Sequence, residues 1–171
     1  MTEKETPAFR QWKRHPVPQR LSLPQHLTVS AVVLFNKNVL LINHKRIGAW
    51  LPPGGHVEEF ELPHEAVVRE VFEETGVRVD VLSPNLPDTS DAEAFLLPSP
   101  LCMHVVHAAE AAGSVYHLDI VYLCSPIETG ASSLPLLTEN AEVHAAAWVP
   151  LDKLNNYLLA KNVLEVISLA I

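Results

Sequence analysis

Residues Gly55–Val77 read GHVEEFELPHEAVVREVFEETGV, and this segment predicts a short helix with an acidic end. Pro63 suits the first helical position, where a missing backbone N–H costs nothing. The run from His64 to Thr75 contains neither glycine nor proline, and Gly76 suits the left-handed residue that commonly ends a helix. Apolar side chains recur about one helical turn apart, at Ala66 and Val67 and again at Val71 and Phe72.

The acidic end of this helix carries Glu70, Glu73 and Glu74, which share one face because of their spacing. Like charges at these spacings repel by about 0.2–0.5 kcal/mol per pair. Anions near a helix C-terminus also face the negative end of the helix dipole, at a cost of about 0.3–1 kcal/mol each. A bound divalent cation would turn this repulsion into attraction, and carboxylate oxygens are ligands that Mg²⁺ and Mn²⁺ prefer. A solvated acidic face is the alternative interpretation of the helix taken alone.

The spacing of the whole segment resembles the sequence motif of the Nudix hydrolase family. That motif is Gly-x5-Glu-x7-Arg-Glu-U-x-Glu-Glu-x-Gly-U, in which U is an aliphatic residue. This chain matches every specified position, with Gly55, Glu61, Arg69, Glu70, Val71, Glu73, Glu74, Gly76 and Val77. So many specified positions at fixed spacing rarely arise by accident, and the match therefore favours a metal site over a solvated acidic face.

The resemblance implies a fold and an activity. The expected fold is α/β, a Nudix-type α/β/α sandwich with a mixed, partly antiparallel central sheet. The expected activity is that of a pyrophosphohydrolase, which cleaves a diphosphate bond in a nucleoside diphosphate linked to another group, assisted by Mg²⁺ or Mn²⁺. The expected partner is a small nucleotide-type substrate, and the resemblance leaves open which group is linked to the diphosphate.

The metal ligands follow from the same resemblance. Glu70, Glu73 and Glu74 resemble the family's metal-binding carboxylates, and the backbone carbonyl of Gly54 resembles a further ligand. Metals held there would neutralise the phosphoryl oxygens and lower the pKa of the attacking water.

The other motif positions resemble a supporting framework. Glu61 and Arg69 are similar to the family's ion pair, which holds the loop against the helix and orients the catalytic acids. Gly55 and Gly76 are expected to be structural, allowing close approach of the backbone and termination of the helix.

Hydrolysis also requires a general base, and family members differ in which acid serves. Glu74 is the first candidate within the motif. Glu142 is the best downstream candidate and Glu139 is the next, although an ordinary loop charge is the alternative interpretation of both.

The composition is that of a folded chain, because 48% of its 171 residues are apolar and only 19% are charged. The length fits one domain with a substantial core. We expect an N-terminal arm over residues 1–26, which is rich in proline, and a single Nudix domain over residues 27–171. Phe9 and Trp12 in the arm are candidates for anchoring it to the domain body or to a second subunit, as in a homodimer.

The formal charge of −8 disfavours nonspecific binding to nucleic-acid backbones, so DNA is not an expected partner. No apolar run has the length of a membrane span or the pattern of a signal peptide, so no membrane association is expected. Cys102 and Cys124 form no metal or redox motif. Facing strands would bring them close together, and we expect reduced, mostly buried thiols in a cytoplasmic protein.

The segments outside the motif predict strands by their β-branched content and alternation. These strands cover residues 26–35, 39–43, 78–82, 101–109, 115–124 and 142–149, with a short strand and turn at 50–54. Residues 101–109 and 115–124 are expected to form a hairpin with its turn at 110–114. Helices are expected over residues 152–159 and 161–171, and their apolar stripe would be Leu154, Leu158, Leu164 and Ile167.

His117 and Asp119 share one strand face with two valines, which is typical of a pocket floor rather than of a solvated surface. His117 is a candidate proton donor or base-binding residue, with Asp119 orienting it. A satisfied surface pair is the alternative for both. Arg46, in the turn after residues 39–43, is a candidate phosphate-binding residue or an ordinary strand-end charge.

Two other classes of function remain open. A Nudix-like domain can bind nucleotides or regulate without turnover, although a degraded motif would favour that reading and this motif is intact. The fold also hosts isopentenyl diphosphate isomerases, whose chemistry requires a particular cysteine and a further acid. No motif surrounds either cysteine here, so the order of preference is hydrolase, then binding domain, then isomerase.

Overall fold

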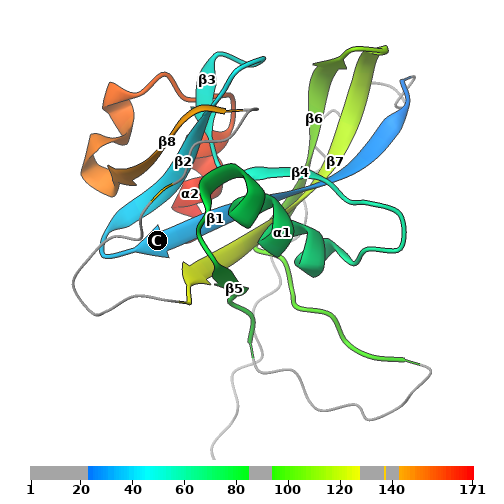
Figure 1. Ribbon diagram of the computed structural model, residues 1–171, viewed down its shortest axis with the longest axis horizontal. Helices are drawn as coiled ribbons and strands as arrows, with labels where there is room; N and C mark the ends of the chain where they lie inside the picture. The colour runs from blue at the N-terminus through cyan, green and yellow to red at the C-terminus, as the bar shows by residue number, and fades with distance from the viewer. Residues whose placement is uncertain (1–22, 85–93, 128–136, 138–142) are drawn as a thin grey trace, which may run out of the picture.

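In the computed structural model of the chain, the described residues are 23–84, 94–127, 137 and 143–171 (Figure 1). The strands are β1 (Gln25–Phe35), β2 (Asn38–His44), β3 (Ala49–Leu51), β4 (Gly54–His56), β5 (Val79–Val81), β6 (Cys102–Glu110), β7 (Gly113–Pro126) and β8 (Val143–Pro150). The helices are α1 (Pro63–Thr75), α2 (Val163–Ser168) and the 3-10 helix η1 (Leu151–Asn156). The predicted anchors Phe9 and Trp12 and the candidate bases Glu139 and Glu142 lie outside the described residues.

The strand β1 is the central strand of an eight-stranded sheet in which the main strand order is β3-β2-β1-β7-β5. The strand β4 pairs with β1, β6 with β7, and β8 with β2. The pairing of β1 with β7 is parallel, whereas its pairings with β2 and β4 are antiparallel. The mixed, partly antiparallel sheet predicted from the sequence is therefore confirmed, and the predicted strands are present with slightly different ends.

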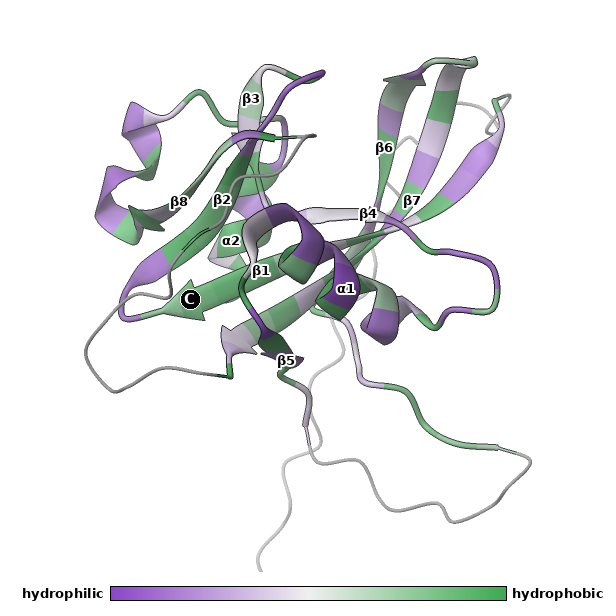
Figure 2. Cartoon of the chain, viewed as in Figure 1, coloured by the Kyte–Doolittle hydropathy of each residue, from purple (hydrophilic) through white to green (hydrophobic). Residues whose placement is uncertain are grey.

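Alternate side chains of β1 enter two separate cores, because successive residues of a strand point to opposite faces. Val29 and Val33 pack with Val67 of α1, and all three are almost fully buried. Val32 packs on the other face with Ile167 of α2. Figure 1 shows α1 in front of the sheet and α2 behind it, and Figure 2 shows the apolar strands between them. The predicted α/β/α arrangement is confirmed.

The helix α1 has the ends that its sequence predicts. It begins at Pro63, and the backbone N–H of Leu62 donates to the Glu65 carboxylate at 3.0 Å, which caps the first turn. It ends before Gly76, whose φ of 73° is left-handed and whose N–H donates to the Phe72 carbonyl at 2.8 Å. Phe72 itself is 47% exposed, so it does not belong to the buried face predicted for this helix.

The C-terminal region differs from the two predicted helices. The segment around Leu158 is extended along β3, because the Trp50 N–H donates to the Leu158 carbonyl and the Ala160 N–H donates to the Trp50 carbonyl. Asn162 then adopts a left-handed φ of 65°, which separates this segment from α2. Leu158 and Leu164 are consequently exposed, and the predicted apolar stripe is wrong at these two positions.

The hairpin β6–β7 is confirmed, with a turn limited to two residues, Ala111 and Ala112. The prediction that the two cysteines lie close together is wrong. Cys124 lies in the core under α1, whereas Cys102 packs against the core on the α2 side. Burial raises the pKa of the Cys124 thiol to about 12, which keeps it protonated.

Neither of the helices α1 and α2 has the length and apolar character needed to cross a lipid bilayer.

The left-handed conformation of Gly76 gives a test of the end of α1. Gly76→Ala should lower the free energy of unfolding by about 1–2 kcal/mol, because a Cβ atom is strained in this region of backbone space. Gly76→Asn should lower it less, because asparagine tolerates this conformation. Urea unfolding followed by circular dichroism measures both values. An alanine variant as stable as the parent would contradict the left-handed cap.

Candidate active site

The guanidinium of Arg69 joins the loop before α1 to the acidic face of the helix. Its Nε and Nη2 donate to the two carboxylate oxygens of Glu61 at 2.8 and 2.9 Å, a bidentate pair. Its Nη1 donates to Glu70 at 2.8 Å and to Glu73 at 3.2 Å. Its Nη2 also donates to the backbone carbonyl of His56 at 3.0 Å. One side chain therefore orients the loop, the helix and the end of β4.

These contacts keep both partners of the central pair ionised. The hydrogen bond from Arg69 lowers the pKa of Glu61, although partial burial opposes this effect. The hydrogen bond to Glu61, reinforced by Glu70, raises the pKa of the guanidinium. Arg69 also offsets part of the repulsion between Glu70 and Glu73 that their spacing predicts. The positive charge of Arg69 therefore balances part of the negative charge on the acidic face, which the spacing of the glutamates alone does not reveal.

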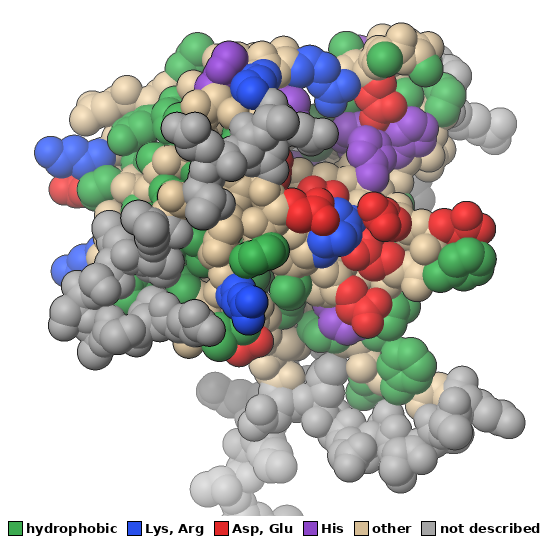
Figure 3. All heavy atoms as spheres, viewed as in Figure 1, with side chains coloured by type: hydrophobic (Ala, Val, Ile, Leu, Met, Phe, Trp, Pro, Cys, Tyr) green, Lys and Arg blue, Asp and Glu red, His purple; other side chains and the backbone are tan. Residues whose placement is uncertain are grey.

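The three candidate metal-binding carboxylates differ in their exposure. The side chain of Glu73 is 53% exposed and that of Glu70 is 15% exposed. Glu74 is almost fully buried, and its Oε2 accepts a hydrogen bond from the backbone N–H of Gly54 at 2.8 Å. Glu74 is thereby fixed against β4, beside the backbone predicted to supply a carbonyl ligand. Figure 3 shows acidic side chains gathered around a basic one on this face of the molecule, next to a group of histidines.

Close packing explains Gly54 and Gly55, the glycine that precedes the motif and the glycine that begins it. A Cβ atom on Gly54 would collide with the backbone of β1 at the Val29 carbonyl. A Cβ atom on Gly55 would collide with the carboxylate of Glu70, so the absence of a side chain there leaves room for a carboxylate instead. The carboxylates of Glu70 and Glu74 therefore lie against a stretch of backbone where only glycine fits, and with Glu73 they offer a set of oxygen donors on one helix face. This donor set suits a hard dication such as Mg²⁺ or Mn²⁺.

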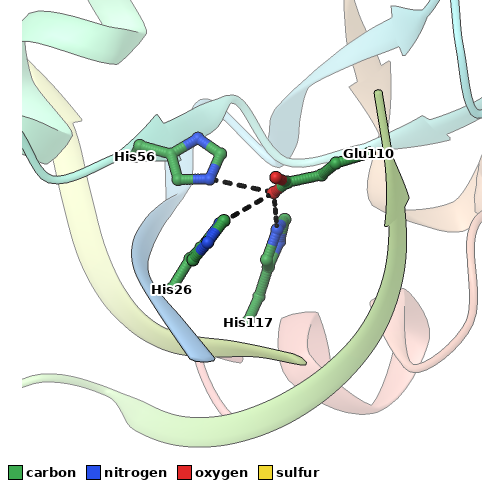
Figure 4. Close-up of side chains that lie close together, drawn as sticks. All are labelled: His26, His56, Glu110 and His117. Carbon is green, nitrogen blue, oxygen red and sulfur yellow. Dashed lines mark hydrogen bonds and ion pairs between the residues drawn. The ribbon is translucent and has the colours of Figure 1, made fainter. Parts of the chain in front are cut away.

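Three histidines converge on one carboxylate beside this acidic face (Figure 4). Oε1 of Glu110 lies 3.1 Å from His26 Nδ1, 3.1 Å from His56 Nε2 and 2.7 Å from His117 Nε2. The hydrogen bond with His117, followed by that with His26, lowers the pKa of Glu110 to about 2. The four residues, which we call the histidine cluster, come from β1, β4, β6 and β7.

Asp119 belongs to a second polar network on the same face of the sheet. It is almost fully buried and accepts hydrogen bonds from the hydroxyl groups of Thr28 and Ser30 at about 2.9 Å. Its Oδ2 lies 2.8 Å from Nε2 of His104. The predicted pairing of Asp119 with His117 is therefore replaced by two separate networks, and the contact to His117 comes from Glu110.

Other predicted site residues are not brought into these networks. Arg46 lies in the exposed turn between β2 and β3, where its backbone N–H donates to Nδ1 of His44. Neither the Arg69 network nor the histidine cluster, as defined by contacts among the described residues, includes Arg46. Its role in binding phosphate remains a prediction, as does the role of Glu142.

Sequence reasoning missed most of the histidine cluster. Glu110 falls in the predicted turn at 110–114, and no motif in the sequence singles out His26 or His56. Strand alternation was the available signal, because it places His26 and His117 on one face if β1 and β7 pair in register, as they do. The pairing itself is not visible in the sequence.

Comparisons with known proteins agree with this fold. A family model described as the NUDIX domain matches residues 24–169. The m7GpppN-mRNA hydrolase NUDT17 of Xenopus laevis is 38% identical over 92 residues, which cover 46% of this chain and 31% of that protein. An RNA pyrophosphohydrolase of Cereibacter sphaeroides (strain KD131) is 41% identical over 61 residues, which cover 33% of this chain and 37% of that protein.

A solved structure extends the likeness to most of the chain. The crystal structure of a NUDIX-family hydrolase from Clostridium perfringens is 27% identical, with a TM-score of 0.67, and the match covers 87% of this chain and 100% of that one. The chain belongs to the NUDIX family. The chain spans less than half the length of the curated relatives it matches.

The geometry of Arg69 gives a test of the loop–helix connection. Arg69→Lys retains the charge but loses the planar fork, so the free energy of unfolding should fall by about 1.5–3 kcal/mol, the range for hydrogen bonds to charged groups. Thermal and urea unfolding measure this change. Arg78→Lys, an exposed position just after the helix, is the matched control and should leave stability nearly unchanged. Equal stability of both variants would show that the fork contributes little.

Proposed function

We propose that this protein hydrolyses a diphosphate bond in a nucleoside diphosphate linked to another group, with Mg²⁺ or Mn²⁺ as cofactor. The proposed metal ligands are the carboxylates of Glu70, Glu73 and Glu74 and the backbone carbonyl of Gly54. The observation that carries the proposal is the placement of the Glu70 and Glu74 carboxylates against Gly55 and Gly54, a stretch of backbone where only glycine fits. A helix end shaped only for stability would place cations there instead.

The chain's own groups divide the work of the reaction. Bound at the carboxylates, Mg²⁺ or Mn²⁺ would neutralise charge on the phosphoryl oxygens and lower the pKa of a water molecule. Arg69 holds Glu70 and Glu73 in fixed orientations, so little reorganisation accompanies substrate binding. Glu74, fixed by the Gly54 N–H, is the proposed general base that takes the proton from the attacking water. Glu142 is the proposed alternative base.

The names of the relatives support the class of substrate. One is an m7GpppN-mRNA hydrolase and another an RNA pyrophosphohydrolase. Both names describe hydrolysis of a nucleotide-containing molecule, and the second specifies a pyrophosphate linkage. We infer a nucleotide derivative as substrate here, with His117 and Asp119 on one sheet face and Arg46 in the turn between β2 and β3 as the proposed substrate-binding residues.

Removal of single carboxylate charges tests the proposal. Glu73→Gln and Glu74→Gln should each lower kcat/KM by on the order of 100-fold, the scale for losing one electrostatic contact to the transition state. Glu65→Gln is the matched control, because Glu65 lies on the same helix, is exposed, and caps the first turn in a way that glutamine preserves. Glu142→Gln, assayed in parallel, distinguishes the two candidate bases.

The assay uses a panel of nucleoside triphosphates, nucleotide sugars, ADP-ribose, dinucleoside polyphosphates and capped RNA, with release of phosphate, pyrophosphate and nucleoside monophosphate as the readout. Activity should disappear with EDTA and return with Mg²⁺ or Mn²⁺. Full activity in the Glu73→Gln and Glu74→Gln variants would show that the site is misplaced. Folded protein that binds nucleotides but turns over nothing in the panel would support the non-catalytic binding domain instead.

A further inference from the structure

In the histidine cluster, more imidazole nitrogens face one carboxylate oxygen than that oxygen has lone pairs to accept hydrogen bonds. One carboxylate oxygen has two lone pairs, yet three imidazole nitrogens lie within 3.1 Å of Oε1 of Glu110. All three rings would have to carry a proton on the facing nitrogen to donate to that single atom. A metal ion removes this conflict, because it accepts an electron pair from each nitrogen and from the oxygen at once.

The spacing of the four ligand atoms also suits a metal. They all lie within 4.8 Å of one another. Four ligands at the usual distance of about 2.0–2.2 Å from a tetrahedral zinc ion would be separated by roughly 3.3–3.6 Å, so small side-chain shifts suffice. The ring centroids of His26 and His56 are 5.4 Å apart and those of His56 and His117 are 5.2 Å apart, with the rings edge to face.

The sheet holds these ligands on a rigid framework. His26 and His117 are paired residues of the parallel strands β1 and β7, so their side chains lie side by side on one face. His56 is the last residue of β4 and pairs with Thr28 of β1, which lies two residues from His26. Glu110 reaches in from the end of β6. Ligands carried by strands are positioned more reproducibly than ligands carried by loops.

We propose that His26, His56, Glu110 and His117 form a binding site for a zinc-type transition-metal dication. Imidazole nitrogens select such ions over Mg²⁺, whereas the carboxylates of α1 favour the harder ion, so the two sites would differ in their metal. Four protein ligands complete a tetrahedral shell, which is the pattern of a structural site rather than a catalytic one. This proposal rests on the geometry of the cluster and not on the hydrolase activity proposed above, and a metal held there would remove His117 from the proposed substrate-binding residues.

The position of the site indicates what the metal would stabilise. It would tie β4 to the β6–β7 hairpin and to the start of β1. The backbone carbonyl of His56 accepts a hydrogen bond from Arg69, so the same residue connects this cluster to the carboxylate face. Metal binding would therefore fix the strand that carries Gly54 and Gly55.

The test is zinc binding by the full-length, untagged protein after removal of metal with EDTA and exchange into metal-free buffer. Competition for Zn²⁺ against a chromophoric chelator should show one tightly held equivalent per chain. Co²⁺ should give a visible absorption band of tetrahedral intensity. His56→Ala and His117→Ala should each abolish both signals. His56 is the safer substitution for folding, because its side chain is 51% exposed.

Two controls make the result specific. His107→Ala removes an exposed histidine from β6, the strand that carries Glu110, and should leave zinc binding unchanged. Glu73→Gln alters the carboxylate site and should also leave it unchanged. Zinc should raise the melting temperature of the parent and both controls, with no rise in the His56→Ala variant. The proposal is overturned if the parent holds no zinc against the chelator, if His56→Ala and His117→Ala both retain it, or if Glu73→Gln loses it.

Discussion

The bidentate pairing of Arg69 with Glu61 is the interaction on which the candidate active site depends. It crosses from the loop after β4 to the middle of α1, and the remaining donors of the same guanidinium contact Glu70, Glu73 and the His56 carbonyl. A lysine ammonium cannot match this planar geometry. Because one rigid cation contacts Glu61, Glu70 and Glu73 together, these carboxylates are held close to one another without an unscreened repulsion between them.

The part of this architecture that the sequence predicts is the part that is local in the chain. The bounds of α1 and its left-handed end at Gly76 follow from residues a few positions apart, and the pairing of Glu61 with Arg69 follows from the resemblance of this segment to the family motif. The histidine cluster does not, because its contact between His26 and Glu110 joins residues 84 positions apart. Helix periodicity at the C-terminus was misleading because of another contact that is distant in the sequence. The backbone around Leu158 forms hydrogen bonds with Trp50 of β3 and does not form the hydrogen bonds of a helix.

The acidic face of α1 and the histidine cluster differ in the atoms they offer to a metal, and the strand β4 contributes to both. The acidic face offers carboxylate oxygens from a helix, next to the backbone of Gly54 and Gly55. The histidine cluster offers mainly imidazole nitrogens from strands. The strand β4 belongs to both, because Gly54 donates its N–H to Glu74 while His56 lies against Glu110. A change in the position of this three-residue strand would therefore alter both groups together, which couples the geometry of the sheet edge to that of the helix face.

The parallel pairing of β1 with β7 has a consequence for how the chain is made. The Thr28 hydroxyl and the carboxylate that it contacts in Asp119 are separated by 91 positions. The ribosome adds roughly 5–20 residues per second, so about 5–18 s would pass between the synthesis of β1 and that of its parallel partner β7. During this interval its apolar residues face water or a chaperone, so the nascent chain is exposed to aggregation at a strand that is deeply buried in the finished sheet.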